Sequence, residues 1–334
     1  MTLLGTLYTE YCALSSFKLD DYPSRPSVTT CLDFTVLQRD GDTVAHRSSD
    51  YQTAQLNQDR VQSGVSRENC RKLFESKIFA RPRGLSTKEL LLSGVDQGLL
   101  HRMDVRFVCG VNALYDISMA GSPGTDLALY AEKISYGGLE YIMITTMGTV
   151  FEPPDPEEEE LKNAFERFMF SEDSLPFHGV YAMPENVTLS KMTFGNIDVL
   201  VKYGFNGMHK GSKVKIQFVN GDDKQHQVRK MSTIARKAYF ANMDQLLVAS
   251  SSFAKFYERC FEDRPRELKT ELYNVKGLVE EDRFLQQDLL LINAFFKKLR
   301  KIFDSNRYAT GVYCTKERAH GPETSKPIRF ELVV

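Results

Sequence analysis

The sequence predicts an α+β protein with an antiparallel meander, hairpins, amphipathic helices and a helical C-terminal third. Three observations support this class. Residues 103–148 contain strand-like segments that are separated by glycine-rich turns. Residues 281–303 repeat apolar side chains at helical spacing. Strands and helices do not alternate regularly along the chain, which argues against a doubly wound parallel sheet.

The N-terminal elements are predicted from alternation and from turn signals. A hairpin is expected over residues 28–45, because apolar residues alternate there and Asp40-Gly41 supplies a tight turn. Residues 46–69 are polar, which predicts a mobile loop or linker. A short helix is expected over residues 70–79, and a capping-box spacing predicts a second helix over residues 86–100.

Four strand-like segments follow, and we expect them to form an antiparallel meander. Glycines at 121, 124, 137 and 138 mark turns between them. The four segments are residues 103–110, 113–119, 126–136 and 139–148.

An acidic run begins the next predicted helix. Asp155 suits the N-cap, Pro156 suits the first helical position, and the glutamates that follow favour the positive end of the helix dipole. Apolar residues then recur at i, i+3, i+4 and i+7, so the run starts a helix and is not an interaction tail.

The remainder of the chain is predicted as a hairpin and two long helices, followed by short strands. The hairpin spans residues 194–219, and the helices span 226–250 and 281–303. Strands are expected at 308–314 and 327–334. The second helix ends in cations, which predicts a core helix whose last turn suits its dipole; a partner groove, a membrane surface and a nuclear import signal are the alternatives.

Charge divides the chain unevenly. Residues 1–200 carry 18 Lys and Arg against 28 Asp and Glu, whereas residues 201–334 carry 25 against 16. We therefore expect an acidic α+β part with the antiparallel sheet over residues 1–200 and a basic part of hairpin and helices over residues 201–334, with one continuous domain as the alternative.

The sequence also predicts the compartment. The six cysteines lie tens of residues apart without a C-x-x-C pair, which predicts reduced thiols and neither a zinc site nor a disulfide framework. The N-terminal segment lacks the basic region of a secretory signal, and no apolar run approaches the roughly 18 residues of a membrane span. We expect a cytoplasmic or nuclear protein that is not secreted and holds neither a metal nor a cofactor.

No catalytic motif matches the sequence. The stretch from Gly204 to Lys213 has the composition of a phosphate-binding loop, but Ser212 precedes Lys213 and the next segment alternates like a strand. The histidines lack metal-binding spacing, and neither a nucleophile elbow nor a dinucleotide fingerprint is present. An enzyme is therefore not favoured, although a site assembled from distant residues stays an alternative.

The best candidate for a binding surface is basic. On the helix after the second hairpin, cations gather on one face, whereas Met231, Ile234, Ala235 and Ala238 occupy the opposite face. The hairpin adds four lysines, so a composite patch for a polyanion or a partner is predicted, with a solvated helix face as the alternative. Its residues are Lys202, Lys210, Lys213, Lys215, His226, Arg229, Lys230, Arg236 and Lys237.

Two aromatic residues lie beside this patch in the sequence. Tyr203 and Phe205 are candidates for stacking on bases. Tyr203 is in phase with the apolar positions of its strand, which favours burial instead.

One family resemblance rests on the order of segments. Arg83-Gly84-x-Ser86, a helix that ends near Leu100, a strand and a hairpin containing Ile134-Ser135-Tyr136 precede the Asp155 helix and Leu175-Pro176. This order resembles the middle of HORMA domains, which capture partner peptides with a mobile C-terminal segment. The resemblance implies a peptide-capturing adaptor. The family's long first helix is not visible here, and the sequence after residue 220 departs from the family.

These observations favour a non-enzymatic binding or assembly protein whose basic C-terminal surface docks a polyanion or an acidic protein partner. The alternatives are a nucleic-acid-binding protein, a HORMA-like peptide-capturing adaptor, and an enzyme with a site assembled from distant residues. The sequence does not fix the oligomeric state.

Overall fold

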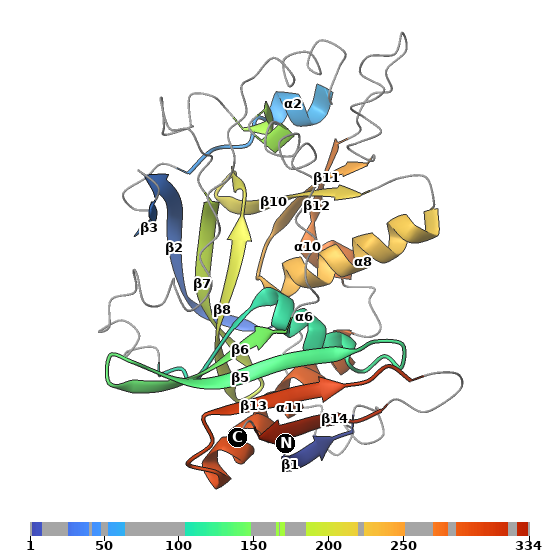
Figure 1. Ribbon diagram of the computed structural model, residues 1–334. Coiled ribbons are helices and arrows are strands. Elements are labelled where there is room, and N and C mark those ends of the chain that lie inside the picture. Colours follow the sequence, from blue (N-terminus) through green and yellow to red (C-terminus); the bar gives the residue numbers. More distant parts are fainter. Residues whose placement is uncertain are drawn as a thin grey trace.

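The described residues form two sheets, with helices between and beside them (Figure 1). This arrangement is seen in a computed structural model of the chain. The structure describes residues 2–8, 26–39, 42–47, 53–63, 104–147, 165–166, 168–170, 185–219, 224–250, 270–279, 285–319 and 326–332.

The larger sheet has ten strands and is mixed. The strand β4 runs parallel to both of its neighbours, and the other adjacent pairs are antiparallel. From one edge to the other the order is β1 (Thr2–Leu7), β14 (Ile328–Leu332), β13 (Gly311–Lys316), β5 (Leu127–Tyr136), β6 (Leu139–Thr146), β4 (Phe107–Gly110), β8 (Ile197–Phe205), β7 (Glu185–Phe194), β2 (Ser27–Arg39) and β3 (Asp42–Arg47).

The smaller sheet has four strands and contains a parallel crossover. Its order is β12 (Thr270–Asn274), β11 (Gln245–Ser250), β10 (Ser212–Val219) and β9 (Gly207–His209). The helix α8 (Lys224–Phe240) connects β10 to β11, which pair in parallel. Parallel neighbours need such a crossover, because a short turn reverses the chain direction.

The main core lies on one face of the larger sheet, which we call the inner face. Side chains of α6 (Val111–Met119), α8 and α11 (Leu285–Ser305) pack there against strands of both sheets. In this core the Phe107 and Phe296 rings lie 5.0 Å apart. A second apolar cluster covers the opposite face of the larger sheet, where Phe34, Leu189 and Leu200 are buried. Two short helices, α2 (Gln58–Ser63) and α10 (Val275–Val279), complete the described elements.

The predicted fold class is wrong in its architecture. The described residues form a large mixed sheet rather than an antiparallel meander with a helical C-terminal third. The described residues after 223 form four strands as well as α8, α10 and α11. Two local misassignments account for most of this difference.

The first misassignment concerns residues 113–119, which belong to α6 and not to a strand. Ala113, Leu114, Ile117 and Ser118 are buried on one helical face. The same segment also has apolar residues at even spacing, so periodicity alone does not distinguish the two structures over so short a run. The helix α6 connects β4 to β5, so these two strands are not joined as a hairpin. Instead, β4 pairs in parallel with β6 and β8.

The second misassignment concerns residues 226–250, where the expected helix ends at Phe240 and a strand follows. Asn242 adopts a φ of 50°, its N–H donates to the Tyr239 carbonyl, and the Met243 N–H donates to the Ala238 carbonyl. These bonds form a Schellman motif, with asparagine in the left-handed position that ends helices. Gln245–Ser250 then pairs as β11, and its Leu246 and Val248 enter the main core.

The second hairpin is also paired differently from the prediction. The strand β8 pairs with β7 through the Gly195-Asn196 turn, and β10 pairs with β9 and β11 in the other sheet. The polar segment 46–69, expected as a mobile loop, contains α2 and two isolated bridges, from Gln55 to Met208 and from Leu56 to Phe170.

Several predicted elements are confirmed. They are the β2–β3 hairpin, the β5–β6 hairpin with both turn glycines at positive φ, the long core helix α11, and the strands β13 and β14. The expected helices at 70–79 and 86–100 and the start of the Asp155 helix lie outside the described residues. In the part of the chain that the structure describes, no helix is long and apolar enough to cross a membrane.

Candidate nucleic-acid interface

A row of polar side chains lies on the inner face of the larger sheet, where β10 of the smaller sheet approaches it. On β7, Asn186, Thr188 and Ser190 alternate with Val187 and Leu189. Successive side chains of a strand point to opposite faces, so the apolar pair enters the second cluster and the polar set faces inward. Thr188 and Ser190 have no exposed surface.

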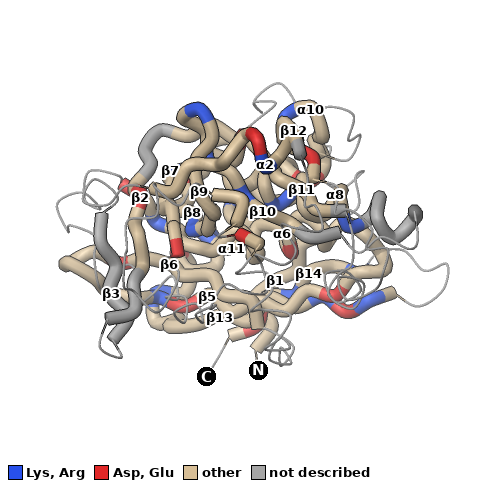
Figure 2. Tube along the Cα trace, turned by 90° about the horizontal axis from the view of Figure 1, so that it is seen from above, with Lys and Arg blue, Asp and Glu red and all other residues tan. Residues whose placement is uncertain are grey.

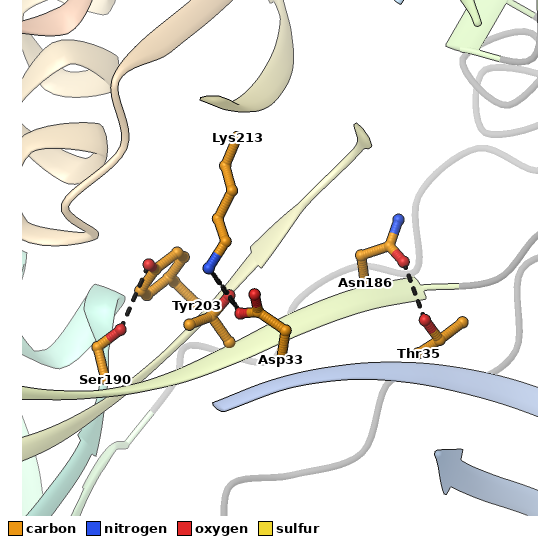
Figure 3. A network of polar contacts seen from close by, with 7 residues as sticks. Asp33, Thr35, Asn186, Ser190, Tyr203 and Lys213 are labelled. Atoms are coloured by element: carbon orange, nitrogen blue, oxygen red, sulfur yellow. Dashed lines mark hydrogen bonds and ion pairs between the residues drawn. The ribbon is translucent and has the colours of Figure 1, made fainter. Parts of the chain in front are cut away.

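Strand register brings the neighbours of this row together. Asp33 of β2 and Tyr203 of β8 are both paired with Thr188, one on each side. Thr35 is paired with Asn186 in the same way, and its hydroxyl donates to the Asn186 Oδ1 at 3.3 Å (Figure 3). The Ser190 hydroxyl lies 3.4 Å from the Tyr203 hydroxyl.

Lys213 of β10 reaches this row from the other sheet (Figure 3). Its Nζ lies 2.6 Å from Asp33 Oδ1 and 2.9 Å from Thr188 Oγ1. The Thr188 hydroxyl donates to the same Asp33 oxygen at 2.7 Å. The three groups form a closed set of charge-assisted hydrogen bonds, which are about twice as strong as neutral ones. We call Asp33, Thr188 and Lys213 the inter-sheet cluster.

Aromatic rings and an asparagine fix the position of Lys213. The ammonium lies 5.2 Å from the Phe205 ring centroid and 5.8 Å from that of Tyr203, within the range of cation–π attraction. Asn206 ends β8 and binds β10 twice: its N–H donates to the Val214 carbonyl, and its Oδ1 accepts from the Ile216 N–H, both at 2.8 Å. Asn206 therefore holds the Lys213 strand over the inner face.

A second lysine of β10, Lys215, reaches the opposite face of the larger sheet, at Gly204. Gly204 is paired with Val187 of the second apolar cluster, so a Cβ on Gly204 would point to that face. The Lys215 Nζ and the Glu185 Oε1 both lie within 3.7 Å of the point where a Cβ on Gly204 would stand. The two lysines of β10 therefore reach β7 and β8 on opposite faces of the larger sheet.

The inter-sheet cluster is open to solvent at one side. The Asp33 side chain keeps 31% of its surface exposed and the Lys213 side chain 16%. Part of the Asp33–Lys213 pair is therefore in contact with solvent.

The structure separates the predicted basic residues into different environments. Lys202 lies on the opposite face of the larger sheet from Lys213, because its paired residue Leu189 belongs to the second apolar cluster. Lys210 is exposed at the β9–β10 turn with a φ of 49°. The side chains of His226 and Arg229 lie outside the described residues.

The helix α8 does not present its cations as one outer stripe. Arg236 is buried and lies 3.2 Å from Asp288 of α11. Lys237 is half-buried, with its ammonium 4.8 Å from the Tyr115 ring centroid, and Lys230 is half-buried as well. The apolar face of α8 is placed as predicted, because Ile234, Ala235 and Ala238 belong to the main core.

Charges of both signs are interspersed over the described elements (Figure 2). Tyr203 is buried, as its strand phase predicts, and Phe205 is buried too, so neither ring offers a stacking face. The sequence prediction contained Lys213 but missed Asp33 and Thr188. The signal that points to Thr188 is the alternation of polar and apolar residues along 186–190.

The described residues provide no cluster for a metal ion. Within the described ranges, no three His, Cys, Asp or Glu side chains come together in a way that could hold one. The inner-facing positions of β7 carry an amide and two hydroxyls, and Asp33 is held by Lys213. Calcium takes six to eight oxygen ligands, and magnesium is usually held by one or two carboxylates together with waters. The one carboxylate beside this row is paired with the Lys213 ammonium, so this donor set does not fit a divalent cation.

Comparison with solved structures identifies the fold. Scheffersomyces stipitis Rai1, solved with (3′-NADP)+ and calcium, has a TM-score of 0.61 at 10% identity, covering 94% of this chain and 91% of that one. Candida albicans Rai1 with pU5 and Mn2+ has a TM-score of 0.63 at 9% identity, covering 95% and 92%. K. lactis Dxo1 with manganese has a TM-score of 0.54 at 10% identity, covering 99% and 95%. No protein-family model and no curated protein sequence matches the chain.

These comparisons correct the expected function. The expectation of a non-enzymatic assembly protein with a basic docking surface, with a HORMA-like adaptor as one alternative, is wrong. The chain has the fold of Rai1 and Dxo1; among the similar Rai1 structures, one holds pU5 and Mn2+, one holds (3′-NADP)+ and calcium, and one holds 3′-FADP. Of the predicted partners, nucleic acid is the one that agrees with the ligands of these structures.

Proposed function

We propose that this chain is an RNA-processing protein of the Rai1 and Dxo1 kind and that it binds phosphorylated RNA on the inner face, beside the inter-sheet cluster. The observation that carries the proposal is the Lys213 ammonium, which belongs to a partly exposed side chain and stands beside the Asp33 and Thr188 side chains on a fold that similar structures share while holding nucleotides. Ammonium groups bind phosphates through charge and hydrogen bonds. An RNA ligand also agrees with the predicted cytoplasmic or nuclear location.

The partner that the proposal favours is a 5′-phosphorylated single strand. The C. albicans Rai1 ligand is pU5, a short oligonucleotide of this kind. Of the remaining residues of the predicted basic set, the exposed Lys210 stays a candidate for contacts with its backbone.

The test is fluorescence anisotropy with labelled pU5 and with the same oligonucleotide lacking its 5′ phosphate. We expect tighter binding of the phosphorylated strand and a fall in affinity with salt, with a log–log slope of about −0.7 for each phosphate contacted. The Lys213→Gln variant should weaken binding about tenfold, equivalent to ~1.4 kcal/mol.

Lys326→Gln is the matched control. Its ammonium pairs with Glu317 at the surface, beside β14, and its removal makes the same change of charge. Equal losses of affinity in both variants would show a general charge effect and would contradict the proposed site.

A second candidate function is hydrolysis of the bound RNA, which is favoured by the divalent cations of the similar structures. The described residues supply no carboxylate cluster for such a cation, so this function requires acidic residues from the rest of the chain. Incubation of labelled pU5 with the protein and Mn2+, followed by separation of the products, tests it; an unchanged oligonucleotide counts against it.

A further inference from the structure

We infer that the inner face binds the RNA phosphate through the Lys213 ammonium and without a divalent cation. The inference rests on the proposed function and concerns the chemistry of the same site. It starts from a disagreement: the similar Rai1 and Dxo1 structures hold calcium or manganese, whereas the described side chains of this chain do not form a group that fits one.

The residues around the inter-sheet cluster explain the disagreement. Along β7 the inward positions 186, 188 and 190 carry one amide and two hydroxyls, which are weak ligands for a hard cation when no carboxylates accompany them. The carboxylate of Asp33 is already bound on one oxygen by Lys213 and by Thr188. The positive charge beside Asp33 is therefore supplied by the Lys213 side chain rather than by a metal ion.

The geometry of Lys213 leaves capacity for a ligand. An ammonium group carries three N–H donors. Among the described residues, Asp33 and Thr188 are its hydrogen-bond acceptors, and the rings of Tyr203 and Phe205 contact it only through their π faces. A phosphate oxygen can take the third donor from the side where Asp33 and Lys213 are exposed.

Asp33 has a defined role in this arrangement. Its negative charge holds the ammonium in place when no ligand is present, and it opposes an approaching phosphate. Removing the Asp33 charge and removing the Lys213 charge should therefore change the affinity for RNA in opposite directions. A cluster that only joined the two sheets would not produce this pair of effects.

The experiment measures the affinity of the full chain for labelled pU5 in EDTA and again in Mn2+. We expect the two affinities to agree within about twofold. In EDTA, Lys213→Gln should weaken binding about tenfold, Lys213→Arg should retain most of it because the charge remains, and Asp33→Asn should tighten it about threefold. Thermal unfolding of each variant shows that the protein is folded at the assay temperature.

The outcomes separate this inference from the proposed function. Binding that disappears in EDTA and returns with Mn2+ would overturn the inference and leave RNA binding in place. Weaker binding in Asp33→Asn, with a folded protein, would also overturn it. An absence of binding to pU5 in both conditions would overturn the proposed function and the inference together.

Discussion

Asp116 shows how a single residue of α6 couples stability to pH. Burial disfavours its charged carboxylate and raises the pKa of Asp116 above the ordinary value, while the charge of Lys237 acts in the opposite direction. The folded protein therefore binds this proton more readily than the unfolded chain does. Stability is lost as pH rises from the ordinary aspartate pKa through the raised one.

The prediction is that Asp116→Asn raises the melting temperature at pH 7. The amide has the same shape and removes the cost of burying the charge. The gain should disappear near pH 3, where the wild-type carboxyl is protonated in both states. Melting curves of both proteins between pH 3 and pH 8 check this; a lower melting temperature for the variant at pH 7 would show that the attraction to Lys237 outweighs burial.

At Asp198, the effect of burial on the pKa is outweighed by nearby hydrogen bonds and positive charges. Partial burial alone would raise its pKa, but hydrogen bonds from Lys191 and Thr193 and the charges of Lys191 and Arg300 outweigh burial, so the pKa of Asp198 lies below its ordinary value. Its contribution to stability is present above the ordinary aspartate pKa and is lost as pH falls through the lowered one. The two aspartates therefore shape the acid limb of the stability curve in opposite directions.

At the scale of elements, α8 and α11 are joined by a buried ion pair. Arg236 of α8 lies 3.2 Å from Asp288 of α11, and both side chains are about nine-tenths buried. Arg236 also donates to the Met119 sulfur of α6. The sequence predicted Arg236 as part of an exposed basic surface, whereas it lies where three helices meet.

We expect Arg236→Met to lower the free energy of unfolding by about 3–5 kcal/mol, because the buried Asp288 loses this cation. Urea unfolding measures the change, with Lys326→Met as the surface control. The double variant Arg236→Met/Asp288→Leu should recover much of the loss, since both charges are then absent. A double variant as unstable as the sum of the single ones would contradict the coupling between these residues.

Elements whose signals are local were predictable from the sequence. Asp40-Gly41 and Gly137-Gly138 marked hairpin turns, and the apolar repeat of α11 marked a long core helix. The end of α8 was missed although Asn242 carries the signal, because asparagine is a weaker stop signal than glycine. The segment 113–119 fitted two periodicities, and tertiary packing decided between them.

The candidate site was predictable only in part, for a reason of topology. Lys213 appeared as a cation on an alternating strand. Its partners come from β2 and β7, and Asp33 is 180 residues away from Lys213 in the chain. The meeting of these residues depends on the order of strands in one sheet and on the placement of the other, and neither is encoded in local spacing.

At the scale of the whole molecule, the larger sheet bears on the predicted division of the chain into an acidic part, residues 1–200, and a basic part, residues 201–334. That sheet contains strands from both sides of the division, with β13 and β14 next to β5 and β1. The main core likewise combines residues of β4 and α6 with residues of α8 and α11. The division into 1–200 and 201–334 stays a prediction, and these contacts favour its alternative of one continuous domain.

The corresponding expectation is that residues 1–200, expressed alone, do not unfold cooperatively. The fragment would expose apolar strands that the second part covers in the full chain. Circular dichroism during heating distinguishes the outcomes, with the full chain as reference. A sigmoidal transition in the fragment would instead establish two independent domains.

The pairing of β1 with β14 has a consequence for synthesis on the ribosome. Thr2 lies opposite Leu332, so β1 finds this partner only after the segments between β1 and β14 have been translated. Until then β1 lacks its hydrogen-bond partner. Leu4 and Leu7, which are half-buried in the folded sheet, are exposed in that interval. Contacts so distant along the chain slow folding. The time between translation of β1 and of β14 is therefore the interval in which a chaperone would have most effect on the yield of this protein.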